Sequence, residues 1–180
     1  EAMAMIADKD HFDAQMNELD AFLASGNFDT VVNALKAYTN LFYRFYDNTD
    51  RRSLVEEKIK TSWDTLTVFM RVDLLTNLAE FALDHTDQNK ALALVNEAQL
   101  LMDTTQWRLE HRIPMISKLI KLRCRASDQQ KAKIDADAML ALFNSQKDTI
   151  VNIDRADALL PLAEAYQSIS DTMTALAVYK

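Results

Sequence analysis

Glycine and proline are scarce in this chain. Its 180 residues include one glycine, Gly26, and two prolines, Pro114 and Pro161, whereas average usage would give roughly 22 glycines and prolines together. Tight β-hairpin turns, phosphate-binding loops and nucleophile elbows need backbone at positive φ, which glycine adopts most easily. The shortage therefore disfavours β-sandwiches, β-barrels, Rossmann sheets and P-loops. The residues that dominate instead, such as Ala, Leu, Lys, Gln and Met, tolerate helix well and predict an all-α fold.

Cysteine, positive charge and long apolar runs are also limited. The one cysteine, Cys124, cannot form an internal disulfide, so it indicates no particular redox compartment. Lys and Arg number 20 against 27 Asp and Glu, a net charge of −7, which argues against non-specific binding to nucleic acid. No run approaches the ~20 apolar residues of a membrane span, and no signal peptide is visible. We expect a soluble chain without membrane insertion, either cytoplasmic or, if an upstream signal peptide was removed, periplasmic or secreted.

Helical periodicity runs through most of the sequence and is interrupted by short polar breaks. Breaks at Ser25–Asn27 and Asp47–Asp50 predict an N-terminal hairpin over residues 1–50. Residues 51–84 contain neither glycine nor proline, which predicts one long helix, or two joined by a slight kink, with its first part over 51–70. Further helices are expected over 88–103 and about 129–144.

The two prolines and the short connections refine this picture. Pro114 is expected in the first turn of a helix that runs to Ala126, because its missing N–H costs nothing there. Pro161 is expected in the first turn of a later helix or at a kink in it. Because every connection is short, neighbouring helices are expected to be antiparallel.

The C-terminal part of the sequence contains an internal repeat. Its last unit reads large-x2-large-small-x2-aromatic in one helix and Ala-x3-aromatic in the next, at Leu159, Leu162, Ala163, Tyr166, Ala175 and Tyr179. The same pattern aligns 43 residues earlier at Ile116, Leu119, Ile120, Arg123 and Ala132. A further shift of 41 residues gives Leu75, Leu78, Ala79, Ala82 and Ala91. Three units therefore align in both of their helices.

This pattern resembles the tetratricopeptide repeat over residues 71–180, and more weakly over residues 10–45. It departs from that family in its period, which exceeds the usual ~34 residues, and at Ile120 and Arg123, where a small and an aromatic residue are expected; other αα-solenoids stay open. The resemblance implies a right-handed αα-superhelix of antiparallel hairpins with about seven to nine helices, in one domain over residues 1–180. Since the chain begins at Glu1 and stops at Lys180 within a helical pattern, we expect a fragment whose last unit is truncated.

Members of the tetratricopeptide family are mostly non-catalytic scaffolds that bind peptides or proteins in a concave groove, and the resemblance implies the same here. Lys118, Lys121 and Arg125 share one helix face. In the repeat register Lys121 corresponds to Glu80 and Glu164, which predicts a ladder of ion pairs worth ~0.2–1 kcal/mol each. Acidic residues predominate, which disfavours a clamp for a C-terminal carboxylate and favours a basic or mixed-charge partner. The candidate partner-binding residues are Asp73, Glu80, Asp84, Lys121, Arg125, Asp157 and Glu164.

Residues 106–133 form a basic segment with eight Lys or Arg and two acidic residues. One interpretation is a binding patch for an acidic peptide or an anionic polymer. The other is charge complementarity between neighbouring repeats, which the register favours. Arg123 lies within the apolar stripe itself, and we prefer a buried ion pair over a partner anchor there, because its stem can cross the core while its guanidinium reaches a carboxylate.

Residues for catalysis or metal binding are sparse. His11, His85 and His111 lie far apart in sequence, and none has a metal-ligating partner at i+4. We therefore predict no catalytic residue, no metal and no cofactor. Cys124 stands between two arginines, which lower a thiol pKa, but without a visible histidine base a half-buried free cysteine is the preferred interpretation. Two alternatives stay open: a ligand-binding or enzymatic domain with a pocket near His85 or His111, and a helical spacer within a larger protein.

Overall fold

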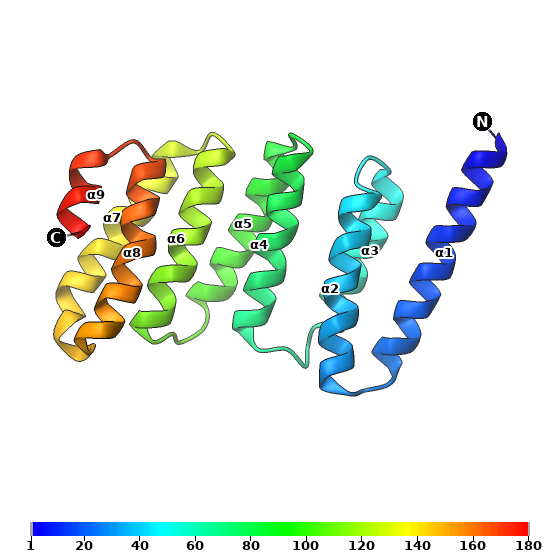
Figure 1. Cartoon of the computed structure of the whole chain (residues 1–180), viewed down its shortest axis with the longest axis horizontal. Coiled ribbons are helices and arrows are strands. Elements are labelled where there is room, and N and C mark those ends of the chain that lie inside the picture. Colours follow the sequence, from blue (N-terminus) through cyan, green and yellow to red (C-terminus); the bar gives the residue numbers. More distant parts are fainter. Residues whose placement is uncertain (1, 180) are drawn as a thin grey trace. The chain divides into compact units, whose positions relative to one another are not determined.

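The computed structural model describes the backbone of residues 2–179 and the side chains of residues 11–151 and 154–179. Over these residues the chain forms nine α-helices and one short 3-10 helix, with no strand (Figure 1). The all-α prediction is confirmed. The helices belong to two compact units that divide between Thr67 and Val68, close to residue 71, where the sequence repeat begins.

The first unit contains α1 (Ala2–Ala24), α2 (Phe28–Arg44) and α3 (Thr49–Ser62). Helix α2 packs against both α1 and α3. Its Leu35, Tyr38 and Phe42 are fully buried. The turn before α2 contains Gly26 at φ +68°, and the Asn27 side chain caps the helix by accepting from two backbone N–H groups. The predicted break at Ser25–Asn27 is therefore confirmed, and it consists of a left-handed residue followed by a helix cap.

Of the two alternatives predicted for residues 51–84, the single long helix is wrong. Two helices form, as the second alternative allowed, but the link of residues 63–67 is more than a slight kink, because α3 ends at Ser62 and α4 (Val68–Asp84) begins six residues later. Trp63 and Leu66 lie in this link and are buried at 8% and 4% exposure. The Leu66 backbone N–H donates to the Trp63 carbonyl over 2.8 Å, which turns both side chains inward. On α3, Leu54 is 48% exposed and its neighbour Val55 is fully buried. Burial of two large apolar residues thus ends the helix where no glycine or proline does.

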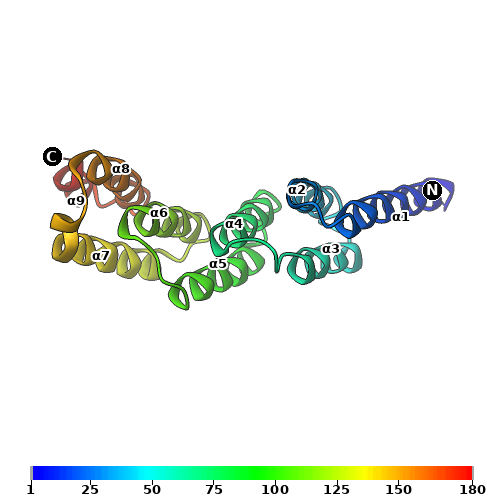
Figure 2. The ribbon, with the colours of Figure 1, turned by 90° about the horizontal axis from the view of Figure 1, so that it is seen from below.

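The second unit is built from three helical hairpins. They are α4 with α5 (Gln88–Asp103), α6 (Leu109–Arg125) with α7 (Gln129–Gln146), and α8 (Asn152–Ser168) with α9 (Thr172–Tyr179); the short 3-10 helix Lys147–Thr149 follows α7. Within this unit α4, α6 and α8 form one layer, and α5 and α7 lie in a second (Figure 2). Helix α6 contacts both α4 and α5, and α8 contacts both α6 and α7. The first helix of each following hairpin therefore packs against both helices of the hairpin before it.

The three hairpins share one register. Helices α4, α6 and α8 each have 17 residues, and their turns place Thr86, Ser127 and Ser170 at φ between +60° and +68°. In each turn the following Asp donates its backbone N–H to a carbonyl five residues earlier, at 2.8, 2.9 and 3.0 Å. This bond closes a Schellman motif, which needs a residue in the left-handed region. Helix boundaries and turns thus recur at the same 41- and 43-residue offsets as the sequence pattern.

Both prolines lie inside helices. Helix α6 begins at Leu109, so the prediction that Pro114 stands in its first turn is wrong, and Pro161 lies well inside α8. A proline removes the N–H that would bond four residues back, which leaves the carbonyls of Glu110 and Asp157 without that helical partner. Both prolines line the same surface depression.

Candidate protein-binding surface

An open depression of about 500 Å³ lies over α4, α6 and α8. We call it the central depression. Four of the seven predicted partner-binding residues line it: Glu80 from α4, Lys121 and Arg125 from α6, and Glu164 from α8. The remaining lining residues are Pro114, Lys118, Leu122 and Pro161. The surface therefore combines charges of both signs with a small apolar floor.

Ion pairs cross the central depression from α6 to both neighbouring helices. Lys121 Nζ lies 2.9 Å from Glu164 Oε2, and Arg125 Nη2 lies 3.1 Å from Asp84 Oδ1. The predicted ladder is thereby confirmed between Lys121 and Glu164. The predicted pair between Lys121 and Glu80 is wrong, because Glu80 lies 4.0 Å from Lys118 instead.

Lys118 was missing from the predicted binding set, although it lies on the predicted face of α6. Its Nζ stands 3.3 Å from Asp73 Oδ1 and 4.0 Å from Glu80 Oε1. Asp73 and Glu80 lie seven residues apart on α4, so their carboxylates are two turns apart on one face. The flexible lysine stem places the ammonium between them. The spacing of 118, 121 and 125 places Lys118 on this face, but it does not identify Asp73 and Glu80 as its partners.

These pairs are exposed enough to exchange partners. The side chains of Lys121 and Glu164 are 38% and 47% exposed, and those of Arg125 and Asp84 are 51% and 47% exposed. Such pairs contribute only ~0.2–1 kcal/mol each. A bound segment carrying its own charges can therefore replace them at little cost to the fold.

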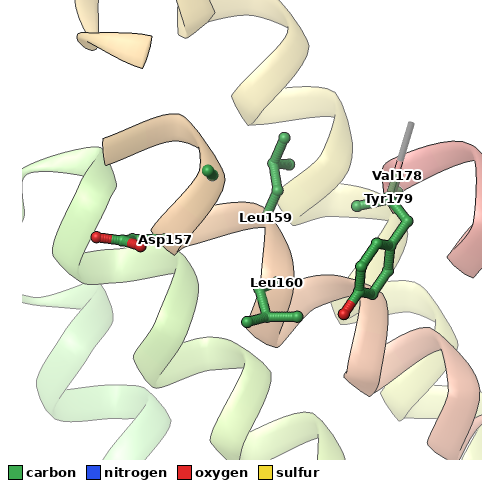
Figure 3. A pocket seen from close by; sticks show the side chains of 6 residues that line it. Asp157, Leu159, Leu160, Val178 and Tyr179 are labelled. Carbon is green, nitrogen blue, oxygen red and sulfur yellow. The ribbon is translucent and has the colours of Figure 1, made fainter. Parts of the chain in front are cut away.

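Asp157 does not belong to the central depression. It lines a separate opening of about 450 Å³ beside α8 and α9, with Ala156, Leu159, Leu160, Val178 and Tyr179 (Figure 3). We call this the α8–α9 cleft. Of the seven predicted residues, six therefore take part in ion pairs that α6 makes with α4 and α8, namely Asp73, Glu80, Asp84, Lys121, Arg125 and Glu164, and Asp157 lies on a different surface.

The basic segment over residues 106–133 is neutralised within the protein. Each of its eight Lys or Arg side chains lies within 4.0 Å of a carboxylate; they are Arg108, Arg112, Lys118, Lys121, Arg123, Arg125, Lys131 and Lys133. Complementarity between neighbouring repeats holds for Arg112, Lys118, Lys121, Arg125 and Lys133, whereas Arg108, Arg123 and Lys131 pair within their own hairpin. The segment does not form an uncompensated cationic patch.

Arg123 is the buried member of this set. Its side chain is 2% exposed, and Nη1 donates to Asp128 Oδ2 over 3.2 Å. Its Nε lies 3.1 Å from Asp135 Oδ2, close enough for charge attraction but without the alignment of a hydrogen bond. The buried-pair prediction is confirmed. Asp128 faces the guanidinium and makes no side-chain cap bond to α7.

The residues considered for chemistry lie apart from these surfaces. Cys124 is half-buried, as preferred from sequence. Burial, reinforced by Asp128, raises the pKa of its thiol, which is opposite to the lowering expected from flanking arginines. His85 lies in the α4–α5 turn and His111 in the first turn of α6, and neither lines the central depression or the α8–α9 cleft. Among the described residues no three His, Cys, Asp or Glu side chains gather as a metal site.

Comparisons with known proteins add no relative. The chain matches no protein-family model, no curated protein and no solved structure. In the part that the structure describes, no helix has both the length and the apolar character needed to cross a bilayer. The functional argument therefore depends on the chain's own residues and their arrangement.

Proposed function

We propose that this chain is a non-catalytic protein–protein interaction scaffold that binds a peptide or protein segment in the central depression. We further propose that the hairpins from Val68 onward form a tetratricopeptide-like, right-handed αα-superhelix. The shared register of the three hairpins and the layer of α4, α6 and α8 support this arrangement. The observation that carries the binding proposal is the lining of one depression by opposite charges from three consecutive first helices.

The charges define the kind of partner. Around the central depression Asp73, Glu80, Asp84 and Glu164 stand against three cations, Lys118, Lys121 and Arg125. This small acidic excess favours a segment with basic or alternating charge. Charges on the partner would replace internal ion pairs of similar strength. The charges of the depression would therefore determine which charge pattern a partner must have, more than they would raise its affinity. Affinity would come from covering the apolar floor at Pro114, Leu122 and Pro161.

The test compares two charge-reversal variants of equal net charge. Lys121→Glu/Arg125→Glu reverses two cations of the central depression. Arg108→Glu/Lys147→Glu is the matched control, since both of its positions are exposed and lie outside the depression. Proteins retained by the immobilised full chain are identified and quantified by mass spectrometry. We expect a specific partner to be lost at least tenfold by the first variant and retained by the second.

Two outcomes would overturn the proposal. Equal retention of the partner by both variants would remove the central depression as the binding surface. Equal loss in both would indicate a general charge effect. The internal pairing of every cation in the basic segment also favours a second candidate, a helical spacer, for which retention by both variants is the expected result.

A further inference from the structure

Glu80 differs from the other carboxylates around the central depression in its hydrogen bonding. Asp73, Asp84 and Glu164 each accept a hydrogen bond from a cation of α6, over 3.3, 3.1 and 2.9 Å. Lys118 Nζ lies 4.0 Å from Glu80 Oε1, which is beyond hydrogen-bonding distance. Within the part of the chain that the structure describes, the Glu80 carboxylate therefore has a cation near it and no hydrogen-bond donor.

The repeat register explains why this carboxylate is left without a donor. Glu80, Lys121 and Glu164 are equivalent positions on α4, α6 and α8, so one ammonium faces two carboxylates. The ammonium donates to Glu164. The other two cations that line the depression, Lys118 and Arg125, donate to other carboxylates of α4. Each cation of the depression is thus already bonded, and Glu80 remains available to a ligand.

Glu80 is also accessible from the depression. Of the described side chains that line this surface, two carry carboxylates, Glu80 and Glu164, and Lys121 already donates to the second. The Glu80 side chain is 40% exposed. Because an exposed carboxylate is hydrogen-bonded to water, a ligand must offer it N–H groups in exchange. A segment that enters the depression therefore meets one carboxylate whose bonds to water it can replace.

The free carboxylate favours arginine over lysine in that segment. A guanidinium donates two parallel N–H groups to the two oxygens of a carboxylate, whereas an ammonium acts as a point charge. Neither Glu80 oxygen is used by a donor of the described chain, so both can accept. The long arginine stem also covers apolar surface while its charged end stays polar. Pro114 and Leu122 supply such surface in the same depression.

We propose that Glu80 selects the partner of the central depression by accepting two hydrogen bonds from an arginine of the bound segment, whose stem covers Pro114 and Leu122. This rests on the proposed function, because a segment must bind in the depression. Unlike a charge that replaces an internal ion pair, the arginine binds without breaking one. Specificity then depends on one carboxylate more than on the net charge of the surface.

The probe is a peptide selected from a random displayed library on the immobilised full chain and then synthesised with a fluorescent label. Fluorescence anisotropy measures its affinity, and amide chemical shifts of the nitrogen-15-labelled chain locate its site. We expect the enriched peptides to share an arginine and to shift the amides of Lys121, Leu122 and Glu164. Glu80→Gln should weaken such a peptide at least tenfold. The matched control Glu57→Gln removes the same charge at an exposed glutamate of α3 and should change the affinity less than twofold.

A double-mutant cycle then tests the contact itself. Replacing the arginine of the peptide by lysine should weaken binding to the unmodified chain at least fivefold, because the second hydrogen bond to the carboxylate is lost. The same replacement should change binding to the Glu80→Gln variant less than twofold, since that variant no longer presents a carboxylate. An equal cost in both chains would overturn the assignment of the arginine to Glu80.

The outcomes separate this role of Glu80 from binding in the depression. Peptides that shift the amides of the depression but lack a shared arginine, or bind Glu80→Gln as tightly as the unmodified chain, would overturn the role of Glu80 alone. Equal losses in Glu80→Gln and Glu57→Gln would also overturn it, as a general charge effect. If no peptide is enriched, or if shifts are confined to other surfaces such as the α8–α9 cleft, the proposed function is overturned as well.

Discussion

Arg123 gives the sharpest prediction about the stability of the second unit. Its guanidinium is buried against Asp128 and Asp135. Removing one member of a buried ion pair costs about 3–5 kcal/mol, because the remaining charge stays desolvated. After Arg123→Ala, Asp128 is still 30% exposed and Asp135 keeps Lys131 as a partner. The cost should therefore lie at the lower end of this range. We expect a loss of about 3 kcal/mol in the free energy of unfolding.

The neighbouring arginine on the same helix provides the matched control. Arg125 pairs with Asp84, and both side chains are about half exposed. Such a pair contributes only ~0.2–1 kcal/mol, so Arg125→Ala should change stability little. A second variant separates charge from packing: Arg123→Ala/Asp135→Leu reproduces the residues Ala82 and Leu94 found at the equivalent positions of the first hairpin, both buried. Since this variant removes the desolvated charge, it should recover much of the loss.

Urea denaturation measures these differences. Because the chain has two compact units, a single two-state transition cannot be assumed for the whole. A Trp63→Phe background leaves Trp107 as the fluorescent reporter of the second unit, where its ring lies 6.3 Å from that of Phe69. The reasoning is refuted if Arg123→Ala costs no more than Arg125→Ala, or if the double variant is less stable than the single one.

Two further predictions concern backbone strain and pH. Thr86→Gly should raise the free energy of unfolding by about 0.5–1 kcal/mol, because the turn holds a β-branched residue at φ +60°. Gly26→Ala should lower the free energy of unfolding by about 1 kcal/mol. The added Cβ meets nothing within 4 Å, so the cost comes from backbone strain at positive φ. Urea midpoints check both signs, and a stabilised Gly26→Ala would contradict them. Burial and the hydrogen bond to Asp137 raise the pKa of Tyr166. A raised pKa in the folded state contributes stability below the ordinary tyrosine value of about 10 and loses it as pH rises through the folded value, so stability of the second unit should fall above pH ~10. Asp137→Asn should lower the phenol pKa in an ultraviolet titration in which Tyr166→Phe identifies the step; an unchanged pKa would exclude the carboxylate as a cause.

Helix boundaries could be predicted from sequence wherever a polar pair marks a turn. The helix expected over 88–103 is α5, since Thr86 and Asp87 supply the left-handed residue and the cap. The break at residues 63–67 also contains a polar pair, Asp64 and Thr65, but this pair alternates with Trp63 and Leu66, which are buried. The apolar spacing of Trp63 and Leu66 also fits a continuous helix, so the pattern alone did not locate the break. Pro114 was misplaced because the preference for a first turn does not exclude an interior position facing an open surface.

The ion pairs of the candidate site could be predicted from sequence where equivalent residues on the first helices of adjacent hairpins lie next to each other. Arg125 and Asp84 are equivalent and pair, as do Lys121 and Glu164. Lys118 pairs with Asp73 and Glu80, which lie off its register on α4. A long lysine stem can reach across a helical turn of ~5.4 Å, so register alone does not fix its partner.

One equivalent position shows how the three hairpins are held in register. It is occupied by Ala82, Arg123 and Tyr166, each at most 2% exposed. The two larger residues extend polar ends to carboxylates beyond their own helix: Arg123 to Asp128 and Asp135, and Tyr166 Oη to Asp137 over 2.9 Å. A buried polar contact is satisfied in one alignment of the paired helices and loses its partner in others. These contacts therefore fix α6 against α7 and α8 against α7. For the binding proposed at the central depression, helices that are already fixed in this way would lower the conformational entropy lost on binding.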